Sequence, residues 1–247
     1  MSRREDLSRV RVANTNVSVA LCLPEGGIET ARALVLLAHS AGSDMNHPLL
    51  VAVATSLAEG GYAAARFNFP YREAGRKAPD PAPKLESTWL AVWDMLHARL
   101  EGRRIPLVVG GKSMGGRVGA QLVTDGVLDP DAVLLFSYPL HRPGMEGLVR
   151  AEPLAGVRAP ILFVTGTRDR MCRVELLDKV RRGLRARTTL HVVEGGDHTL
   201  DTGTLDLAER ARVHAELAEV ARAWLGRSLR ARQWRSTATI RAHSLVR

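Results

Sequence analysis

The chain has 247 residues, of which 45% are hydrophobic and 25% charged, and its net charge is +9. This length suffices for one large core, and no apolar run reaches the roughly 18 residues that a membrane span needs. The N-terminus, MSRREDLSRV, lacks the apolar stretch of a secretory signal, so we expect a cytoplasmic protein with no membrane partner. Cys22 and Cys172 offer neither a disulfide framework nor metal-ligand spacing, so we expect no metal and no cofactor.

Most of the net positive charge lies at the ends of the chain. Residues 226–247 contain six arginines and no acidic residue, whereas the body of the chain is nearly neutral. We therefore expect residues 1–225 to form a single domain and residues 226–247 to form a basic, partly disordered tail. Because Trp234 is the only aromatic residue in this tail, its charge does not favour a nucleic-acid partner.

The hydrophobic pattern predicts an α/β protein. Residues 9–23 resemble an antiparallel hairpin that turns near Asn14–Asn16. Beyond residue 30, strands are expected at 33–39, 61–69, 105–111, 132–139, 160–166 and 188–195. Helices are expected between them, at 45–60, 86–101, 114–125, 173–183 and 205–225. This alternation of strands and helices predicts a doubly wound, mostly parallel sheet with the hairpin at its edge.

Two segments rich in proline and glycine, 70–84 and 139–159, are expected to be loops that form pocket walls rather than a lid domain. The second is expected to hold at most a short helix. Cations of the first segment suit a carboxylate or phosphate on a substrate, although a solvated charged loop is the alternative. Four side chains in or directly before this segment are candidate substrate contacts: Arg72, Arg76, Tyr71 and Asn68.

The strongest motif is Gly111-Lys112-Ser113-Met114-Gly115, a G-x-S-x-G pattern between a predicted strand and a predicted helix. This placement is typical of a nucleophile elbow, in which a sharp turn exposes the serine at the carboxyl edge of a sheet. The same residues do not complete a phosphate-binding loop, because that motif needs a glycine where this chain has Pro106.

A serine hydroxyl needs a base to remove its proton and an acid to orient that base. Asp169 follows one predicted strand and His198 follows the next, so both are expected at the same edge as Ser113. The order serine, aspartate, histidine predicts a catalytic triad. Asp197 is a rival acid, but its adjacency to His198 makes it awkward for orienting that ring. Alternatively, Asp169 caps a helix and His198 is a surface residue.

Two backbone N–H groups are expected to stabilise the negative charge of a tetrahedral intermediate. One belongs to Met114, directly after the nucleophile. The other candidate is Ala41, in the loop after the strand at 33–39. His39, in the same loop, is expected to be structural rather than a second base.

Five ordered motifs between residues 33 and 200 resemble dienelactone-hydrolase-like α/β-hydrolases, a group that includes the testis-expressed and non-specific-lethal-complex subunit-three relatives. The motifs are HSAGSDMNHP, RFNFPYREAGRKAPD, GGKSMGGR, GTRDR and GGDHTL. The resemblance implies the α/β-hydrolase fold and a triad of Ser113, Asp169 and His198. It departs from the family pattern at Ser40, where a glycine is usual; a positive φ there would strain the loop that presents Ala41.

The residues predict a serine hydrolase that cleaves an ester or related acyl bond of a small molecule through an acyl-Ser113 intermediate. The alternative is a catalytically weak scaffold or binding protein with the same fold. Acyl transfer to an acceptor other than water also stays open, as does the oligomeric state.

Overall fold

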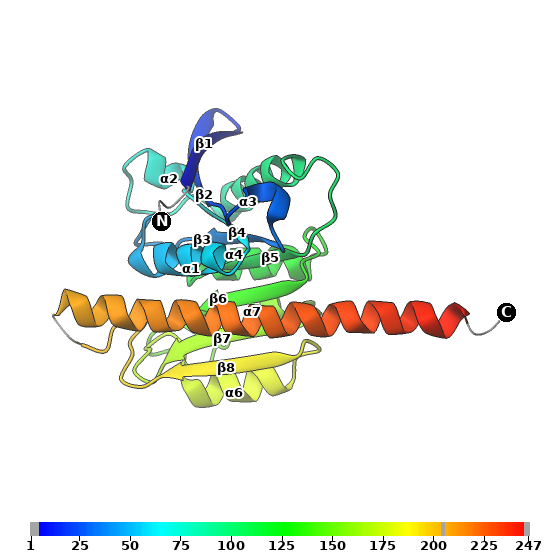
Figure 1. Ribbon diagram of the computed structural model, residues 1–247. Coiled ribbons are helices and arrows are strands. Elements are labelled where there is room, and N and C mark those ends of the chain that lie inside the picture. The colour runs from blue at the N-terminus through cyan, green and yellow to red at the C-terminus, as the bar shows by residue number, and fades with distance from the viewer. Residues whose placement is uncertain (1–4, 204–205, 245–247) are drawn as a thin grey trace.

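The computed structural model describes residues 5–203 and 206–244, with side chains described as far as residue 230. Eight strands form one sheet in the order β1-β2-β4-β3-β5-β6-β7-β8 (Figure 1). The strands are β1 Glu5–Val12, β2 Thr15–Cys22, β3 Leu34–Ala38, β4 Ala63–Phe67, β5 Leu107–Lys112, β6 Ala132–Phe136, β7 Ile161–Gly166 and β8 Thr188–Val193. The helices are η1 Ile28–Thr30, α1 Pro48–Glu59, α2 Pro70–Glu73, α3 Ala82–Ala98, α4 Met114–Thr124, α5 Glu152–Ala155, α6 Val174–Arg182 and α7 Leu207–Ser244.

The predicted N-terminal hairpin is confirmed. β1 and β2 pair antiparallel with Val12 opposite Thr15, and β2 continues into the sheet by antiparallel pairing with β4. The turn uses Ala13 with a φ of 49°, so it begins one residue before the predicted position. A two-residue turn with positive φ matches the right-handed twist of the two strands.

The other strands pair in parallel, as the sequence predicts. Every residue of β3, β4 and β6 is buried. A parallel strand in the middle of a sheet has helices on both faces, so apolar residues occupy both sides of it. This burial explains why these strands appear in the sequence as unbroken apolar runs.

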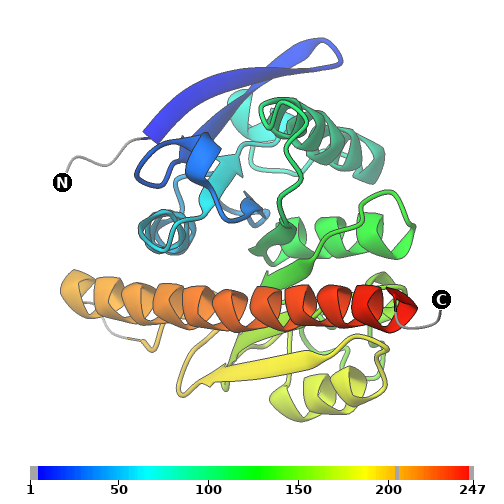
Figure 2. The same cartoon turned by 45° about the vertical axis from the view of Figure 1, so that its right-hand side comes forward.

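Helices cover both faces of the sheet. α1 and α7 lie side by side on one face, where Leu50, Val53 and Trp224 join the core (Figures 1 and 2). α3, α4 and α6 cover the opposite face and contribute Trp89 and Leu177, among others, to a second core. The doubly wound prediction is therefore confirmed.

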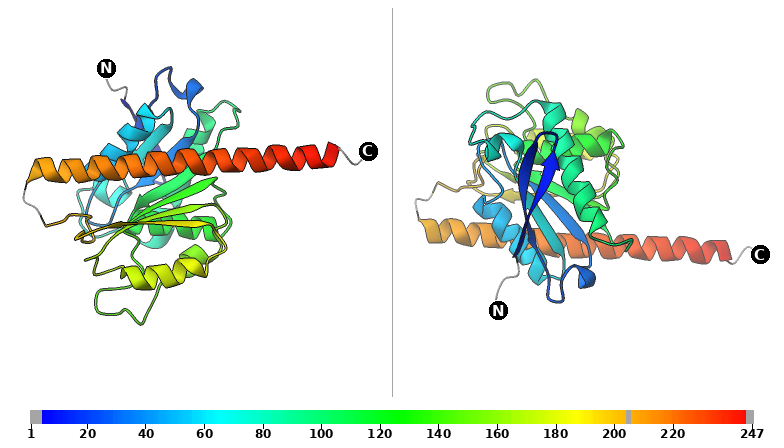
Figure 3. Two further views of the ribbon diagram at one scale, coloured as in Figure 1. Left: turned by 60° about the horizontal axis from the view of Figure 1, so that its bottom comes forward. Right: turned by 90° about the horizontal axis from the view of Figure 1, so that it is seen from above.

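The last helix differs from the prediction. α7 runs from Leu207 to Ser244, so the domain boundary expected at residue 225 falls inside it (Figure 3). Leu225 and Leu229 are buried against the sheet, which makes residues 226–230 part of the packed body. Leu225 and Leu229, four residues apart on one helix face, explain why the helix continues past residue 225 as far as residue 230. Within the part of the chain that the structure describes, no helix is long and apolar enough to span a membrane.

The two expected loops contain some helix. Residues 70–73 form the short helix α2, and α3 begins at Ala82, earlier than predicted. Prolines at the start of both helices are compatible with a first turn, whose N–H groups need no partner within the helix. The connection from β6 to β7 holds only the four-residue helix α5, so no lid domain is inserted there.

The topology directs ligands to one place on the sheet. β3 and β5 are neighbours, but the chain continues from β3 to β4 on one side and from β5 to β6 on the other. The carboxyl ends of strands at such a switch point leave a crevice between diverging connections. Ser113 directly follows β5, and the loop that contains Ala41 follows β3.

Candidate active site

Ser113 occupies a strained turn between Lys112, the last residue of β5, and Met114, the first residue of α4. Its φ of 49° and ψ of −116° lie where residues other than glycine are rare, at a cost of about 1–3 kcal/mol. The Ser113 N–H donates to the Phe136 carbonyl at 2.9 Å, which ties the turn to β6. Such strain persists only where the surrounding structure holds it, so it marks Ser113 as a functional candidate.

The glycines of the motif permit close packing of backbone around this turn. A Cβ on Gly115 would lie 2.5 Å from the Ala38 carbonyl oxygen, and one on Gly111 would lie 2.6 Å from the same atom. Real Cβ atoms do not approach so closely. A side chain at Gly115 would push α4 away from β3, and one at Gly111 would push β5 away from β3 and α4. Glycine at both positions therefore brings the end of β3 beside the nucleophile.

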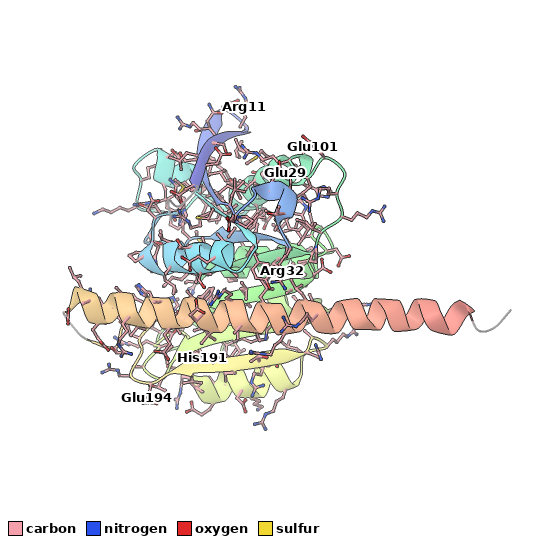
Figure 4. The ribbon with its side chains drawn as sticks, viewed as in Figure 1. Arg11, Glu29, Arg32, Glu101, His191 and Glu194 are labelled. Atoms are coloured by element: carbon pink, nitrogen blue, oxygen red, sulfur yellow. The ribbon has the colours of Figure 1, made fainter. Side chains whose placement is uncertain are left out.

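The three predicted triad residues lie together. The His198 Nε2 is 2.9 Å from the Ser113 Oγ, and the His198 Nδ1 is 2.9 Å from both carboxylate oxygens of Asp169. With the proton on Nδ1 donated to the carboxylate, Nε2 accepts the hydrogen bond of the Ser113 hydroxyl. The Asp169 side chain is fully buried, whereas the His198 side chain is 24% exposed. All three residues lie at the carboxyl edge of the sheet. In Figure 4 this edge can be found by the label on Glu194, the residue directly after β8.

The carboxylate of Asp169 is held in place from its own loop. Its Oδ1 accepts a hydrogen bond from the Met171 N–H at 2.8 Å. Asp197, the rival acid, instead accepts hydrogen bonds from the N–H and hydroxyl of Thr199 and from the N–H of Asp201. The structure therefore pairs His198 with Asp169 and leaves Asp197 to organise the loop that follows the histidine.

Two buried side chains hold the loop that contains Ala41. His39 donates from Nδ1 to the Ser40 carbonyl at 2.8 Å and accepts at Nε2 from the Phe69 N–H at 3.1 Å. Burial lowers the pKa of His39 to about 4, so the ring is neutral. Both ring nitrogens have backbone partners, so His39 holds two loops together rather than acting as a second base. The Tyr71 hydroxyl donates to the Ala41 carbonyl at 2.9 Å. Sequence reasoning identified His39 as structural but missed this contact of Tyr71.

Ser40 does not strain the loop. It is not among the residues with positive φ, and its hydroxyl lies 2.8 Å from that of Ser43. The Ser40 carbonyl also accepts the Ser43 N–H. A serine therefore replaces the usual glycine of the family without a conformational penalty, and its side chain adds a hydrogen bond within the turn.

We expect Tyr71→Phe to lower kcat or the rate of serine labelling about three- to tenfold, because one buried hydrogen bond to the Ala41 peptide is lost. Tyr62→Phe is the matched control, since Tyr62 is buried directly before β4, at the opposite edge of the sheet. Steady-state kinetics of both variants would test the loop's dependence on Tyr71. Equal rates for Tyr71→Phe and the wild type would contradict it.

The neutral state of His39 predicts a dependence of stability on pH. Its pKa in the folded protein, about 4, is below the ordinary value of 6.5, so the unfolded chain binds more protons between these values. Its stabilising effect is present above about pH 6.5 and is lost as the pH falls towards 4, by up to about 3 kcal/mol. Denaturant titrations at pH 7 and pH 5 should show this loss, with a smaller loss in His39→Gln. The same loss of unfolding free energy in both proteins would argue against His39 as a cause of the pH dependence.

The other predicted substrate contacts have partners within the protein. The Asn68 amide accepts from the Met45 N–H and donates to Glu73. Arg72 lies 3.8 Å from an Asp44 carboxylate oxygen, and Arg76 lies 2.5 Å from one of Asp80. Tyr71 is completely buried. Each polar group thus connects parts of the protein to one another, and a contact of these four side chains with a substrate stays a prediction.

A cavity of about 310 Å³ lies beside the histidine loop, lined by His47, Leu200 and His214 among others. It is formed by the start of α1, residues 199–202 and the first turns of α7, and Ser113 is not part of its wall.

Among the described residues, no group of three or more His, Cys, Asp or Glu side chains is arranged to hold a metal ion.

Comparisons with known proteins agree with this fold. The family model described as an alpha/beta hydrolase domain matches residues 31–226. Est1E from Butyrivibrio proteoclasticus is 16% identical with a TM-score of 0.71, over 90% of this chain and 98% of that chain. A dienelactone hydrolase from Anabaena variabilis is 19% identical with a TM-score of 0.71, over 91% and 98% of the two chains.

A third structure, XC6422 from Xanthomonas campestris, is described as an α/β serine hydrolase without a lid. It is 18% identical to this chain, with a TM-score of 0.64, and the match covers 87% of this chain and 95% of that one. These three structural similarities support the fold alone. The family model, in contrast, matches most of the sequence of this chain. From the match and the strand order together, we conclude that the chain belongs to the α/β-hydrolase family.

Proposed function

We propose that this α/β hydrolase is a serine esterase that cleaves an ester or related acyl bond of a small molecule. The observation that carries the proposal is the continuous hydrogen-bonded series from Ser113 through His198 to Asp169, with 2.9 Å at each step. A buried carboxylate, a partly exposed imidazole and a strained serine at one sheet edge form the arrangement that activates a hydroxyl for attack on a carbonyl carbon.

In the first half of the reaction, the Ser113 Oγ attacks the carbonyl carbon of the ester while His198 takes the hydroxyl proton at Nε2. The carbonyl oxygen becomes negative and accepts hydrogen bonds from the N–H groups of Met114 and Ala41. His198 then gives the proton to the leaving alkoxide, and the C–O bond breaks to release an alcohol and leave acyl-Ser113.

Water completes the cycle. His198 takes a proton from a water molecule, whose oxygen attacks the acyl carbon of acyl-Ser113. The second tetrahedral intermediate collapses, the proton returns to the Ser113 Oγ, and a carboxylic acid leaves. Throughout, Asp169 keeps the proton on the His198 Nδ1 and stabilises the positive imidazolium.

The conformation of Ser40 supports an active enzyme over a catalytically weak scaffold. A positive φ at Ser40 would strain the loop around Ala41 and weaken catalysis, and Ser40 has no positive φ. The hydrogen bonds from His39 and Tyr71 to this loop are those expected of a preorganised oxyanion site.

A fluorophosphonate probe tests the proposal directly, because it reacts with an activated serine and leaves a stable adduct. We expect intact-mass and peptide analysis to locate one adduct on Ser113. A panel of activated esters of increasing acyl length, including a lactone, then identifies the substrate class. A folded protein that neither reacts with the probe nor hydrolyses any ester of the panel would overturn the proposal.

A further inference from the structure

Lys112 is a buried cation directly beside the nucleophile. It is the last residue of β5 and only 2% exposed. Side chains alternate along a strand, so Lys112 shares the face of Val108, whose side chain packs in the core beneath α1 and α7. Lysines are almost never buried without a partner, because removing an ammonium group from water is costly.

The partner of this ammonium group is the catalytic histidine's own backbone. The Lys112 Nζ donates a hydrogen bond to the His198 carbonyl oxygen at 3.0 Å. Lys112 is also bonded covalently to Ser113 through the chain. One residue therefore connects to the nucleophile through its backbone and to the general base through its side chain.

The charges around Lys112 favour this contact. The carboxylates of Asp169 and Asp197 attract its ammonium group, while burial lowers the pKa of Lys112 to about 8. The imidazoles of His47, at the start of α1, and His214, on α7, face the same charge, and burial is the main cause that lowers the pKa of both rings. Neutral imidazoles do not repel the ammonium group, which stays beside the histidine loop. A deprotonated Lys112 would still have two N–H donors for the His198 carbonyl.

The contact with Lys112 joins the histidine loop to β5. Asp197 and Thr199 organise the turn locally, and Leu200 adopts a positive φ of 65° within it. These contacts shape the turn but do not tie it to β5. The imidazole of His198 is held by Asp169, while its peptide carbonyl is held by Lys112. Hydrogen bonds from Arg168 to the carbonyls of Gly195, Gly196 and Thr202 hold the ends of this loop against β7. Loss of the Lys112 contact would remove the hydrogen bond at the His198 peptide itself, which joins that peptide to the end of β5 beside Ser113.

We propose that Lys112 is a positioning residue that sets the distance between Ser113 and His198 by holding the His198 carbonyl. The inference rests on the proposed serine-hydrolase function. It adds to that function a role for Lys112, the residue between Gly111 and Ser113 in the motif. Misplacement of a catalytic group by about 1 Å costs up to about 100-fold in rate, so the contact affects kcat more than substrate binding.

The test is Lys112→Met, which keeps a long unbranched side chain and removes the N–H donors. We expect kcat for an activated ester and the rate of fluorophosphonate labelling both to fall at least about tenfold, with KM within about twofold of the wild type. Lys112→Arg keeps a donor at this position and should recover part of the loss. Val53→Ala, a core change on the same face, controls for lowered stability without touching the site.

The outcomes separate the two proposals. If the wild type is labelled at Ser113 and Lys112→Met keeps a kcat within twofold, the positioning inference is overturned and the proposed function stands. A raised KM with unchanged kcat would make Lys112 a substrate contact and overturn the inference as well. If Lys112→Met does not fold, Lys112→Gln is measured in the same way, and failure of both to fold would make Lys112 a folding requirement instead. A wild type that the probe does not label removes the proposed function and the inference together.

Discussion

Ser113→Ala is expected to abolish fluorophosphonate labelling and to lower ester hydrolysis at least about 10⁴-fold. The reason is that the covalent intermediate cannot form without the Ser113 Oγ, so only the oxyanion donors and substrate binding remain. The fold should be unaffected, because alanine removes one hydroxyl from a turn held by the Ser113 N–H and the neighbouring glycines. Active-site titration followed by initial-rate kinetics measures the effect.

His198→Ala is the companion variant, and Asp197→Asn is its control. We expect His198→Ala to lose nearly as much activity as Ser113→Ala, since the serine then has no base. Asp197 lies next to His198 but hydrogen-bonds to Thr199 and Asp201, so its replacement should affect stability more than rate. If Asp197→Asn instead matched the loss of Asp169→Asn, the assignment of Asp169 as the orienting acid would be contradicted.

Gly166→Ala is expected to cause the largest structural disturbance of any single methyl addition near the site. A Cβ on Gly166 would lie 2.0 Å from the carbonyl oxygen of Gly196, which also accepts the Arg168 N–H at 2.8 Å. Gly166 ends β7 three residues before Asp169, and Gly196 lies two residues before His198. The added methyl group must therefore push apart the two loops that bring acid and base together.

We expect this variant to lose about 3 kcal/mol or more of unfolding free energy, or about 10 °C in Tm, and most of its activity. Differential scanning fluorimetry and ester kinetics measure the two effects. Gly147→Ala is the control, because no atom lies within 4 Å of its added Cβ and its φ is not positive. A Gly166→Ala protein with the Tm and kcat of Gly147→Ala would show that the loops tolerate separation.

The fold was largely predictable because its signals are local. Strands buried on both faces appear as apolar runs, and the helices between them appear as amphipathic segments. The errors also have local causes. The end of α7 was placed too early because the helix changes from an apolar to an arginine-rich composition near residue 225, although Leu229 still packs on the core. Helix α2 was missed because four residues carry too little periodicity to predict.

The candidate triad was also predictable, because Ser113 directly follows β5, Asp169 and His198 lie in the loops that follow β7 and β8, and parallel strands end at one edge. The internal partners of the candidate substrate contacts were not predictable. Arg72 and Arg76 look like anion ligands in the sequence, where nothing reveals that Asp44 and Asp80 face them in space. Tyr71 looks like a pocket residue, but its hydroxyl reaches a carbonyl thirty residues earlier in the chain.

The chain's order of residues therefore determines the sheet, the strained serine turn and the identity of the three candidate triad side chains. These depend on contacts between neighbours in sequence and on the rule that parallel strands share an edge. The choice of Asp169 over Asp197, the relaxed conformation of Ser40 and the contact of Lys112 with His198 depend on distances between separate loops. Such distances follow from how closely backbone segments pack, at Gly115 against β3 and at Gly166 against Gly196, and no pattern along the chain encodes them.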